Sequence, residues 1–404
     1  MSVEDDPLFL MRADPECDDA LKARYVWAKS FPYDAEIEQW LPLWQHLDDT
    51  AEIAGMIWDS WVSGATKRLF TDVIGEAESR LLVQWLAGIH DIGKATPAFA
   101  VQVGRLADRM NREAGLRWTG MVLSDRANLR HELAGAAILD RWLSERSRLS
   151  PPERRQFTAV VAGHHGAFPS ARVVSEAPAL AHLMGDEAWT HVQNVLLDRC
   201  AKRLDFDPEA AWLRSRLPQS AMLLLTGIVI MSDWIASDSE LFPLLEVDAV
   251  PEMQPNETSP STRARAAWSR VSLGNRWVPP ARSIALEGQF GARFGFAPHV
   301  MQRDVVAAAE TMVAPGLLML EAPMGGGKTE AAFAAAEVLA RRSGASGVYV
   351  ALPTQATSNS MFSRMLAWLT SLPAGEGETQ TVNLAHGKAA LNDEFRAIAR
   401  THDG

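Results

Sequence analysis

Apolar residues recur at three- and four-residue spacing through the first 245 residues of the chain. The segments LLVQWLAGIHD, HELAGAAILDRWL and QFTAVVAGHHG show this spacing, which is typical of helices that bury one face. The strict alternation that marks strands is scarce in this region. Residues 1–245 are therefore predicted to form an all-α domain.

The pattern changes after this region. The segment EVDAVPEMQPNETSPST combines prolines and acids without an apolar period, so residues 246–280 are predicted to be a linker. Over 281–404, GLLMLEAPMGGGKTEAAFAAAEVLARR reads as strand, glycine-rich loop and helix, and GVYVALPTQATSNSMF repeats this order. Alternating strands and helices predict a parallel sheet with crossover helices.

The most apolar run, AMLLLTGIVIM at 221–231, is about half as long as a membrane crossing requires. Asp233 follows it, so we interpret it as a buried helix that carries an acid into the interior, and we expect no membrane association. The acidic N-terminus does not resemble a secretory signal. Two cysteines, Cys17 and Cys200, are too few for a disulfide framework and favour a cytoplasmic location.

Length and charge add two limits. A chain of 404 residues favours two or more domains. With 39 basic and 50 acidic residues the net charge is −11, which argues against a protein coated in nucleic acid but allows a local basic channel. Six arginines against three acids lie between Arg105 and Arg130. They could follow DNA phosphates, or they could belong to a solvated polar insertion.

Five of the ten histidines and two aspartates lie at predicted helix ends or beside small residues. These seven residues are His46, His90, Asp91, His131, His164, His165 and Asp233. Neighbouring helical residues point about 100° apart, so each doublet can face one cluster only at a helix end or break. Gly93, Gly163 and Gly166 supply such breaks. Imidazoles and carboxylates among apolar helices are costly to bury unless a divalent cation compensates them.

The order of these residues resembles the HD metal-dependent phosphohydrolase superfamily. The resemblance implies that Asp91 bridges two ions, one completed by His46, His90 and Asp233 and the other by His131, His164 and His165. Nitrogen and carboxylate ligands suit manganese, iron, cobalt, nickel or zinc. Two such ions can activate a bridging water for in-line attack on a phosphodiester. Asp91 and Lys94 are the predicted catalytic residues. Lys94 could steady a phosphate oxygen, or it could be a solvated cation at a helix end.

A second motif, EAPMGGGKTEAA, follows an apolar strand and opens a helix. In this context the backbone of Gly325, Gly326 and Gly327 can approach a triphosphate, while Lys328 reaches its β- and γ-phosphates and Thr329 binds Mg²⁺. A glycine-rich turn without a nucleotide is the alternative. We expect ATP and magnesium at this loop.

The alanine-proline start of this loop resembles the APxGxGKT loop of superfamily 2 helicases. Gln302 in FGFAPHVMQRDV resembles the helicase glutamine that reads adenine. The segment ALPTQATSNSMF resembles the next helicase motif, which implies contacts between the DNA backbone and Pro353, Thr354 and Gln355.

One helicase part is missing from the sequence. A motor requires an acidic pair after a strand, and the only Asp-Glu pair downstream of the loop, Asp393–Glu394, reads as a helix start. The second RecA-like lobe is also missing. We therefore expect the chain to hold ATP loosely without productive hydrolysis, and to be a fragment or a truncated product.

Taken together, the motif order resembles the nuclease–helicase family of type I CRISPR antiviral interference. The resemblance implies an all-α HD domain followed by a partial α/β RecA-like P-loop helicase lobe. It also implies endo- or exonuclease activity on single-stranded DNA, coupled in a complete motor to 3′–5′ helicase activity. An RNA-guided surveillance complex is the expected protein partner, and the chain itself is expected to be a monomer.

Three alternatives remain. An HD enzyme could hydrolyse nucleotides or cyclic dinucleotides instead of polymers. The chain could instead bind DNA or the surveillance complex without cutting. A P-loop kinase fused to a helical domain is disfavoured by the alanine-proline start and by Gln302.

Overall fold

The computed structural model divides into two compact units, residues 1–62 with 66–271 and residues 63–65 with 272–404. The described residues are 22–32, 37–118, 126–170, 173, 180, 182–250, 262–271, 273, 277–279, 285–312, 316–373 and 381–402. Cys17 and the proline-rich stretch 251–261 lie outside them. Each unit is described by itself below.

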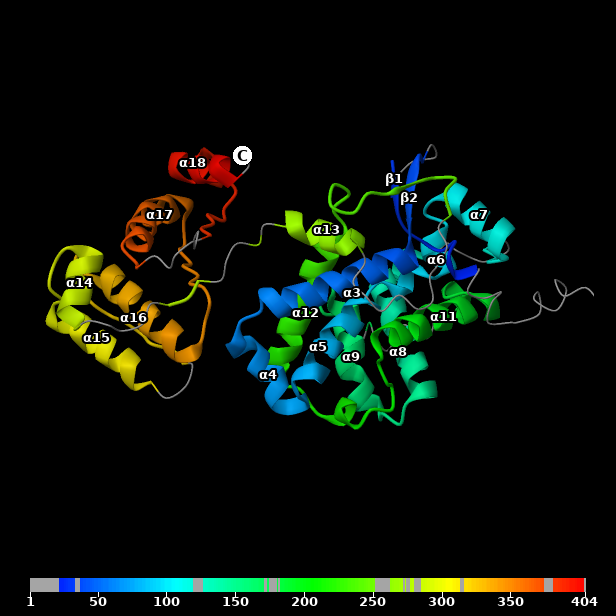
Figure 1. Ribbon diagram of the computed structural model, residues 1–404, viewed down its shortest axis with the longest axis horizontal. Helices are drawn as coiled ribbons and strands as arrows, with labels where there is room; N and C mark the ends of the chain where they lie inside the picture. Colours follow the sequence, from blue (N-terminus) through cyan, green and yellow to red (C-terminus); the bar gives the residue numbers. More distant parts are fainter. Residues whose placement is uncertain are drawn as a thin grey trace, which may run out of the picture. The chain divides into compact units, whose positions relative to one another are not determined.

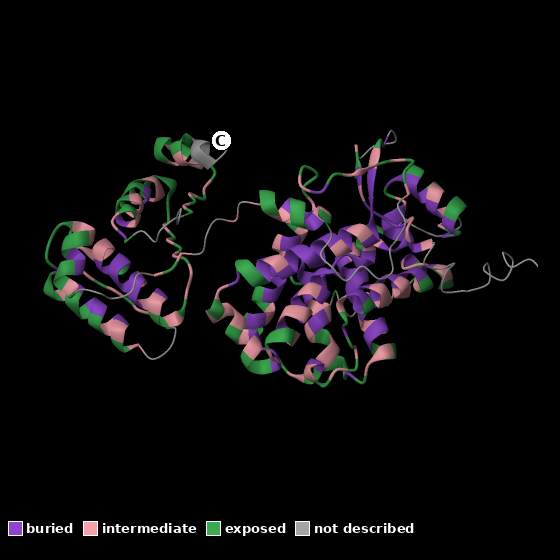
Figure 2. Cartoon of the chain, in the orientation of Figure 1, coloured by how far each residue is buried: buried purple, intermediate pink, exposed green. Residues whose placement is uncertain are grey.

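The first unit is mostly helical, as the apolar spacing predicts (Figure 1). Its main helices are α3 (Leu43–Ser60), α4 (Gly64–Ile74), α5 (Glu76–Ala87), α7 (Gly104–Ala114), α8 (His131–Arg146), α9 (Pro151–Gly163), α11 (Glu187–Leu204), α12 (Gln219–Ala236) and α13 (Thr262–Arg270). Short turns of helix, η1 (Ile92–Lys94), α6 (Pro97–Ala100), η2 (Arg126–Asn128) and η4 (Ala211–Arg214), connect them. Buried positions gather on the facing sides of these helices (Figure 2).

Helix α3 is buried around most of its circumference because α5 and α12 pack along it and α13 adds a further contact. Its buried polar residues therefore need partners within the protein. Glu52 pairs with Arg203 of α11, with 3.1 Å between Oε1 and Nη1. Asp49 pairs with Arg263 of α13, with 3.0 Å between Oδ2 and Nε. The remaining buried polar side chain of chemical interest on α3 is His46.

A small antiparallel sheet was not foreseen in this region. Its strands are β1 (Trp27–Phe31), β2 (Gln39–Pro42) and β3 (Leu245–Glu246), in the order β1-β2-β3. The register shifts between Trp27 and Lys29, as in a β-bulge. The strands are short and β3 is far away in sequence, so a local period could not reveal them.

The segment predicted as a linker contains an ordered helix. Helix α13 belongs to the first unit and packs against α3. The Arg263 guanidinium lies 5.4 Å from the centre of the Phe242 ring, and Arg270 donates to the Glu240 carbonyl oxygen at 2.7 Å.

Helix α12 has one buried face instead of the fully buried surface expected of it. Length and composition alone would allow it to cross a membrane. It packs against α3, α5 and α9, whereas Leu223, Leu224 and Trp234 are exposed on its other side.

The second unit contains α14 (Leu286–Phe294), α15 (Val300–Thr311), α16 (Lys328–Ser343), α17 (Gln355–Thr370), η5 (Ala389–Leu391) and α18 (Asp393–His402). Glu337 is a buried carboxylate of α16 that accepts hydrogen bonds from Gln289 and Arg293 of α14 and from Trp368 of α17. These bonds tie three helices of the unit together.

The segments predicted as strands in this unit, GLLML and GVYV, form no β-ladder among the described residues. Their side chains still alternate in burial. Leu318 and Leu320 pack against the helices, whereas Leu317 and Met319 are exposed. A strand requires hydrogen bonds to a neighbouring strand. These segments have the burial pattern of a strand, but no such neighbour lies among the described residues.

Candidate metal centre

Five separate elements bring the seven predicted residues to one place in the first unit. His46 lies on α3, and His90 and Asp91 follow the end of α5 at Gly88. His131 is the first residue of α8, His164 caps the end of α9 with His165 next to it, and Asp233 lies in the last turn of α12. The doublets are at helix ends, where two neighbouring side chains can face one cluster.

The Asp91 carboxylate lies at the centre of the cluster. Its Oδ2 is 3.2 Å from His46 Nε2 and 3.4 Å from His90 Nε2. Its Oδ1 is 3.2 Å from His131 Nε2 and 3.4 Å from His164 Nε2. Each oxygen of this one carboxylate therefore faces a different pair of histidines.

Two groups of donor atoms result. His46, His90, Asp91 and Asp233 form one group, and His131, His164 and His165 form the other, with the atoms in each group within 4.8 Å of one another. Asp233 Oδ1 lies 3.2 Å from His46 Nε2 and 3.5 Å from His90 Nε2. This separation into two groups matches the two ligand sets expected from the resemblance.

The imidazole nitrogens fit a bound cation. His90 Nδ1 donates to the Ala87 carbonyl at 2.8 Å, and His164 Nδ1 donates to the Val161 carbonyl at 2.6 Å. These bonds leave Nε2 of both rings as an acceptor pointing into the cluster. Nε2 of His46, His90 and His164 is buried without a hydrogen-bond partner among the described residues. Leaving such atoms unpaired is costly, and coordination to a divalent cation would satisfy them.

The electrostatics favour ionised carboxylates. Burial alone would raise the pKa of Asp91, but Lys94 and His90 hold it well below its ordinary value. Burial likewise opposes ionisation of Asp233, but the His46 and His90 rings, whose Nε2 atoms lie 3.2 and 3.5 Å from its Oδ1, lower its pKa. Burial lowers the pKa of His90, yet the Asp91 charge and the close contacts with both carboxylates raise it to about 10. The two ionised carboxylates therefore stabilise positive charge here, which a proton on His90 and the Lys94 ammonium provide, and a bound cation would displace that proton.

Lys94 is part of this charge arrangement. Its Nζ lies 2.6 Å from Asp91 Oδ2 and 5.6 Å from the centre of the Phe99 ring. The side chain is only 12% exposed, so it is not a freely solvated cation at a helix end.

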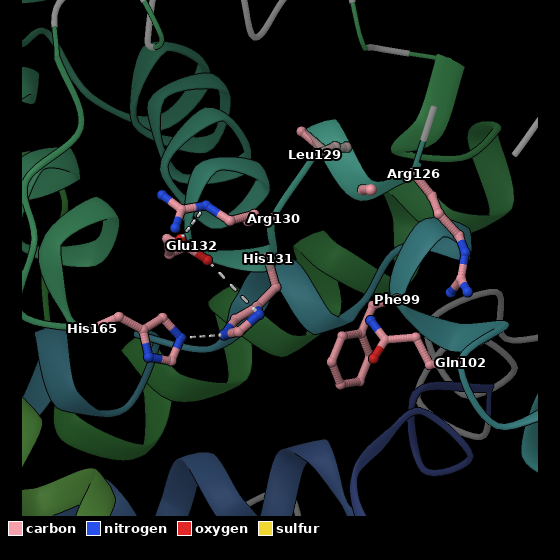
Figure 3. Close-up of a pocket in the computed structure, with 9 residues that line it drawn as sticks. Phe99, Gln102, Arg126, Leu129, Arg130, His131, Glu132 and His165 are labelled. Carbon is pink, nitrogen blue, oxygen red and sulfur yellow. Dashed lines mark hydrogen bonds and ion pairs between the residues drawn. The ribbon is translucent and has the colours of Figure 1, made fainter. Parts of the chain in front are cut away.

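His165 lies at the rim of the cluster. Its Nε2 is 2.9 Å from His131 Nε2, and the ring is exposed (Figure 3). Burial of part of the ring and the nearby His164 lower the pKa of His165, which favours the neutral form that binds metals.

The sequence did not point to Lys29. This half-buried residue follows the bulge in β1, and burial together with Lys94 lowers its pKa to about 8. Asp233, Asp91 and Asp49 oppose that shift, so Lys29 lies within electrostatic reach of the cluster. The sequence feature that could have pointed to Lys29 is the presence of a charged residue within the apolar segment VWAKSF.

Gly93 also has a clearer role than a helix break. A Cβ at this position would collide with the His131 carbonyl oxygen and the Gly135 nitrogen. Only glycine lets η1 approach α8 this closely, so Gly93 sets the position of the Asp91 segment relative to His131.

The glycine-rich loop of the second unit has the backbone expected of it. Gly325 and Gly327 have positive φ angles of 77° and 75°. Lys328 Nζ donates to the Ala322 and Pro323 carbonyls at 2.5 and 2.9 Å, which folds its side chain back over the loop. Thr329 and Gly326 are partly buried beside it.

Gln302 is placed differently from a residue that reads a base. Its side chain is fully buried, its Nε2 donates to the Gly327 carbonyl at 3.1 Å, and its Oε1 accepts from the His299 amide at 2.9 Å. Gln302 therefore supports the backbone of the loop in this structure.

The three predicted DNA-binding residues lie together at the start of α17. The Thr354 hydroxyl caps the helix by accepting from the Thr357 amide at 3.2 Å. Pro353 and Gln355 flank it, and all three are exposed.

The arginines between 105 and 130 do not form one track. Arg105 donates to the Ile37 carbonyl at 3.1 Å, and the Arg109 guanidinium lies 3.9 Å from the Trp40 ring centre and donates to the Val247 carbonyl. These two tie α7 to the sheet. Arg126 and Arg130 instead line one cavity with His131; Arg130 lies beside His131, and Arg126 lies nearer Gln102 (Figure 3).

Comparisons with known proteins agree with this architecture. A family model described as Cas3, HD domain matches residues 27–242. The chain is 32% identical over 399 residues to the CRISPR-associated nuclease/helicase Cas3 of Streptococcus thermophilus, covering 92% of this chain and 41% of that protein. It is 33% identical over 382 residues to the CRISPR-associated endonuclease/helicase Cas3 of Thermus thermophilus, covering 92% of this chain and 38% of that protein.

A crystal structure of a CRISPR-associated protein superposes with a TM-score of 0.71 and 29% identity, covering 88% of this chain and 38% of that one. The chain thus spans about two fifths of the length of the curated relatives it matches.

Proposed function

The chain belongs to the Cas3 HD-domain family, and from this premise we propose that its first unit is a metal-dependent nuclease that cuts single-stranded DNA. The observation that carries the proposal is the Asp91 carboxylate, whose two oxygens face two different sets of histidines. One carboxylate that serves two cations would need this arrangement.

His46, His90 and Asp233 would hold one cation, His131, His164 and His165 the other, and Asp91 both. The donor set fits manganese, iron, cobalt, nickel or zinc. When bound, such a pair supplies an activated water and charge that stabilises the oxygens of a phosphodiester during in-line attack.

The protein's own residues orient the site. The Ala87 and Val161 carbonyls fix the His90 and His164 rings. Lys94 holds Asp91 in place and puts a positive charge beside the position of a scissile phosphate.

For the whole protein we propose ATP-dependent 3′–5′ helicase activity in CRISPR interference, with an RNA-guided surveillance complex as partner. The names of the curated relatives, nuclease and helicase, support this. The loop at Gly325–Thr329 would bind ATP with magnesium, and Pro353, Thr354 and Gln355 would contact the DNA backbone. We further propose that the chain works as a monomer in the cytoplasm.

The test is cleavage of circular single-stranded DNA with Mn²⁺, with and without chelator. Loss of a residue that only supports a metal ligand lowers activity roughly 10- to 100-fold. We expect His90→Ala and Asp91→Ala, which each remove a ligand, to lower the cleavage rate by more than that. His182→Ala, at an exposed histidine outside the cluster, should cut normally. Circular dichroism should show the same helix content in all variants.

Unchanged cutting by both variants would refute the assigned site. Intact circles beside hydrolysed nucleotide or cyclic dinucleotide would favour a small-molecule substrate. Binding without any cutting under every metal tested would favour a DNA-binding role.

A further inference from the structure

A cavity of about 310 Å³ opens beside the second group of metal-site histidines. His131 and His165 line one part of it, and Phe99, Gln102 and Arg126 line another (Figure 3). This volume is at the lower end of the roughly 300–1,000 Å³ typical of ligand pockets, which suits one nucleotide better than a duplex. Because His131 and His165 belong to both the cavity and the metal centre, the cavity adjoins the place where a phosphodiester would be cut.

The two arginines of the cavity differ in whether a carboxylate pairs with them. Arg130 Nε is 2.9 Å from Glu132 Oε1, so a buried carboxylate already neutralises it. The Arg126 guanidinium pairs with no carboxylate among the described residues, and it is exposed. Among the described residues, Arg126 is thus the cation of this cavity that has no carboxylate partner.

The rest of the wall suits the neutral part of a nucleotide. The Phe99 ring is held by Trp27, with 4.4 Å between ring centres, and it lies 5.8 Å from the His131 ring. In Figure 3 Phe99 lies between Gln102 and His131. Phe99 is largely buried and adds a small apolar area to the wall, while the exposed Gln102 amide offers a hydrogen-bonding group to a sugar or base edge.

We propose that this cavity is the subsite for the nucleotide next to the scissile phosphate, with Arg126 binding the neighbouring phosphate of the DNA strand. The proposal rests on the nuclease function proposed above. It makes Arg126 a substrate-positioning residue that acts on binding of the strand, whereas the chemical step depends on the metal-site residues.

The test compares Arg126→Gln with Arg112→Gln. Arg112 is a matched control because it lies in the same arginine-rich stretch, is exposed, and has an ion pair with its neighbour Glu113 as its one ion pair among the described residues. The first measurement is the anisotropy of a short fluorescein-labelled oligothymidylate binding to the chelator-treated full chain at several salt concentrations. The second is Mn²⁺-dependent cleavage of the same oligonucleotide and of bis(p-nitrophenyl) phosphate, a diester that has no neighbouring phosphate for Arg126 to bind.

Loss of one arginine–phosphate contact should weaken DNA binding about 10-fold and reduce the salt slope by about 1. KM for the oligonucleotide should rise by about the same factor, with kcat and hydrolysis of the small diester unchanged. Arg126→Lys should keep part of the binding, because it retains the charge without the two-pronged geometry. Arg112→Gln should behave as the unaltered chain.

Equal binding and equal salt slopes for Arg126→Gln and Arg112→Gln would overturn the subsite. Slower hydrolysis of the small diester by Arg126→Gln would also overturn it, by placing Arg126 at the reacting atoms. If the unaltered chain cuts nothing but Arg126→Gln still weakens DNA binding, the proposed nuclease function fails and the subsite stands.

Discussion

At the scale of single residues, the site depends on how one carboxylate divides its two oxygens. Asp91 Oδ1 faces His131 and His164, while Oδ2 faces His46 and His90. Oδ2 also contacts Lys94 Nζ, a fixed positive charge that a bound cation must tolerate. We therefore expect the Lys94 charge to weaken metal binding at Asp91 Oδ2 while it helps cleavage.

Replacing Lys94 by methionine separates these two effects. We expect Mn²⁺ to bind about tenfold more tightly, because a like charge is removed, and kcat for DNA cleavage to fall about 100-fold. Titration calorimetry and single-stranded DNA cleavage measure the two quantities.

A lysine that only holds Asp91 in place would give a different result, with weaker metal binding and slower cleavage together. Lys67→Met is the control, since Lys67 lies over the Trp58 ring, 5.4 Å from its centre, and contributes nothing to the cluster.

The residue types of the site could be predicted from the sequence, whereas their geometry could not. The two doublets beside glycines, three further residues on or beside predicted helices, and an order that resembles the HD superfamily together selected the seven residues. Which oxygen faces which ring depends on the packing of five elements. Lys29 could not be selected because it lies on a strand within a region whose period predicts helices, and its proximity to the cluster depends on a bulge.

At the scale of elements, close approach of η1 and α8 fixes the site. Gly93→Ala should destabilise the first unit by about 1–3 kcal/mol, because the added methyl meets backbone atoms that cannot move aside. It should also weaken Mn²⁺ binding by displacing Asp91 from His131. Urea unfolding and calorimetry measure the two changes.

Gly104→Ala is the matched control. Nothing lies within 4 Å of a Cβ at Gly104, so the free energy of unfolding should change by no more than about 0.5 kcal/mol. Equal effects of the two substitutions would show that the approach of η1 to α8 is not what Gly93 permits.

Elements with a strong local period were predictable, and elements defined by distant partners were not. The periodic segments HELAGAAILDRWL and QFTAVVAGHHG form α8 and α9. Strand β3 escaped because it pairs with β2 about 200 positions away, and β1 and β2 escaped because they are short strands before a strongly helical region. The segment GLLML was predicted to be a strand, but it has no strand partner among the described residues, and Leu318 and Leu320 pack on helices.

At the scale of the whole molecule, the two units should respond separately to metal. Cys200 is a buried thiol of the first unit, and burial raises its pKa to about 12, so it should react only when this unit opens. In a Cys17→Ser chain it is the single thiol. Its modification by a thiol reagent in mild urea therefore reports on the first unit alone.

Mn²⁺ at 100 times its dissociation constant should stabilise this unit by about 2.7 kcal/mol and slow the modification about 100-fold. Chelator should restore the original rate, and Asp91→Ala should abolish the protection. Equal protection in Asp91→Ala would mean that the cation binds elsewhere.

The order of the two units along the chain was evident from the change in composition near residue 246. The position of the boundary was less evident, because composition does not show that α13 is held to α3 by Arg263 and Asp49. That contact joins residues more than 200 positions apart.

The same ion pair has a mechanical consequence. Asp49 lies three residues after His46, about one turn along α3. The chain beyond Val271 therefore leaves the end of α13, and α13 is bound by this ion pair to α3 at a point about one turn from His46. Force on the segment beyond Val271 would therefore reach α3 through α13, whose ion pair to α3 is close to the metal centre.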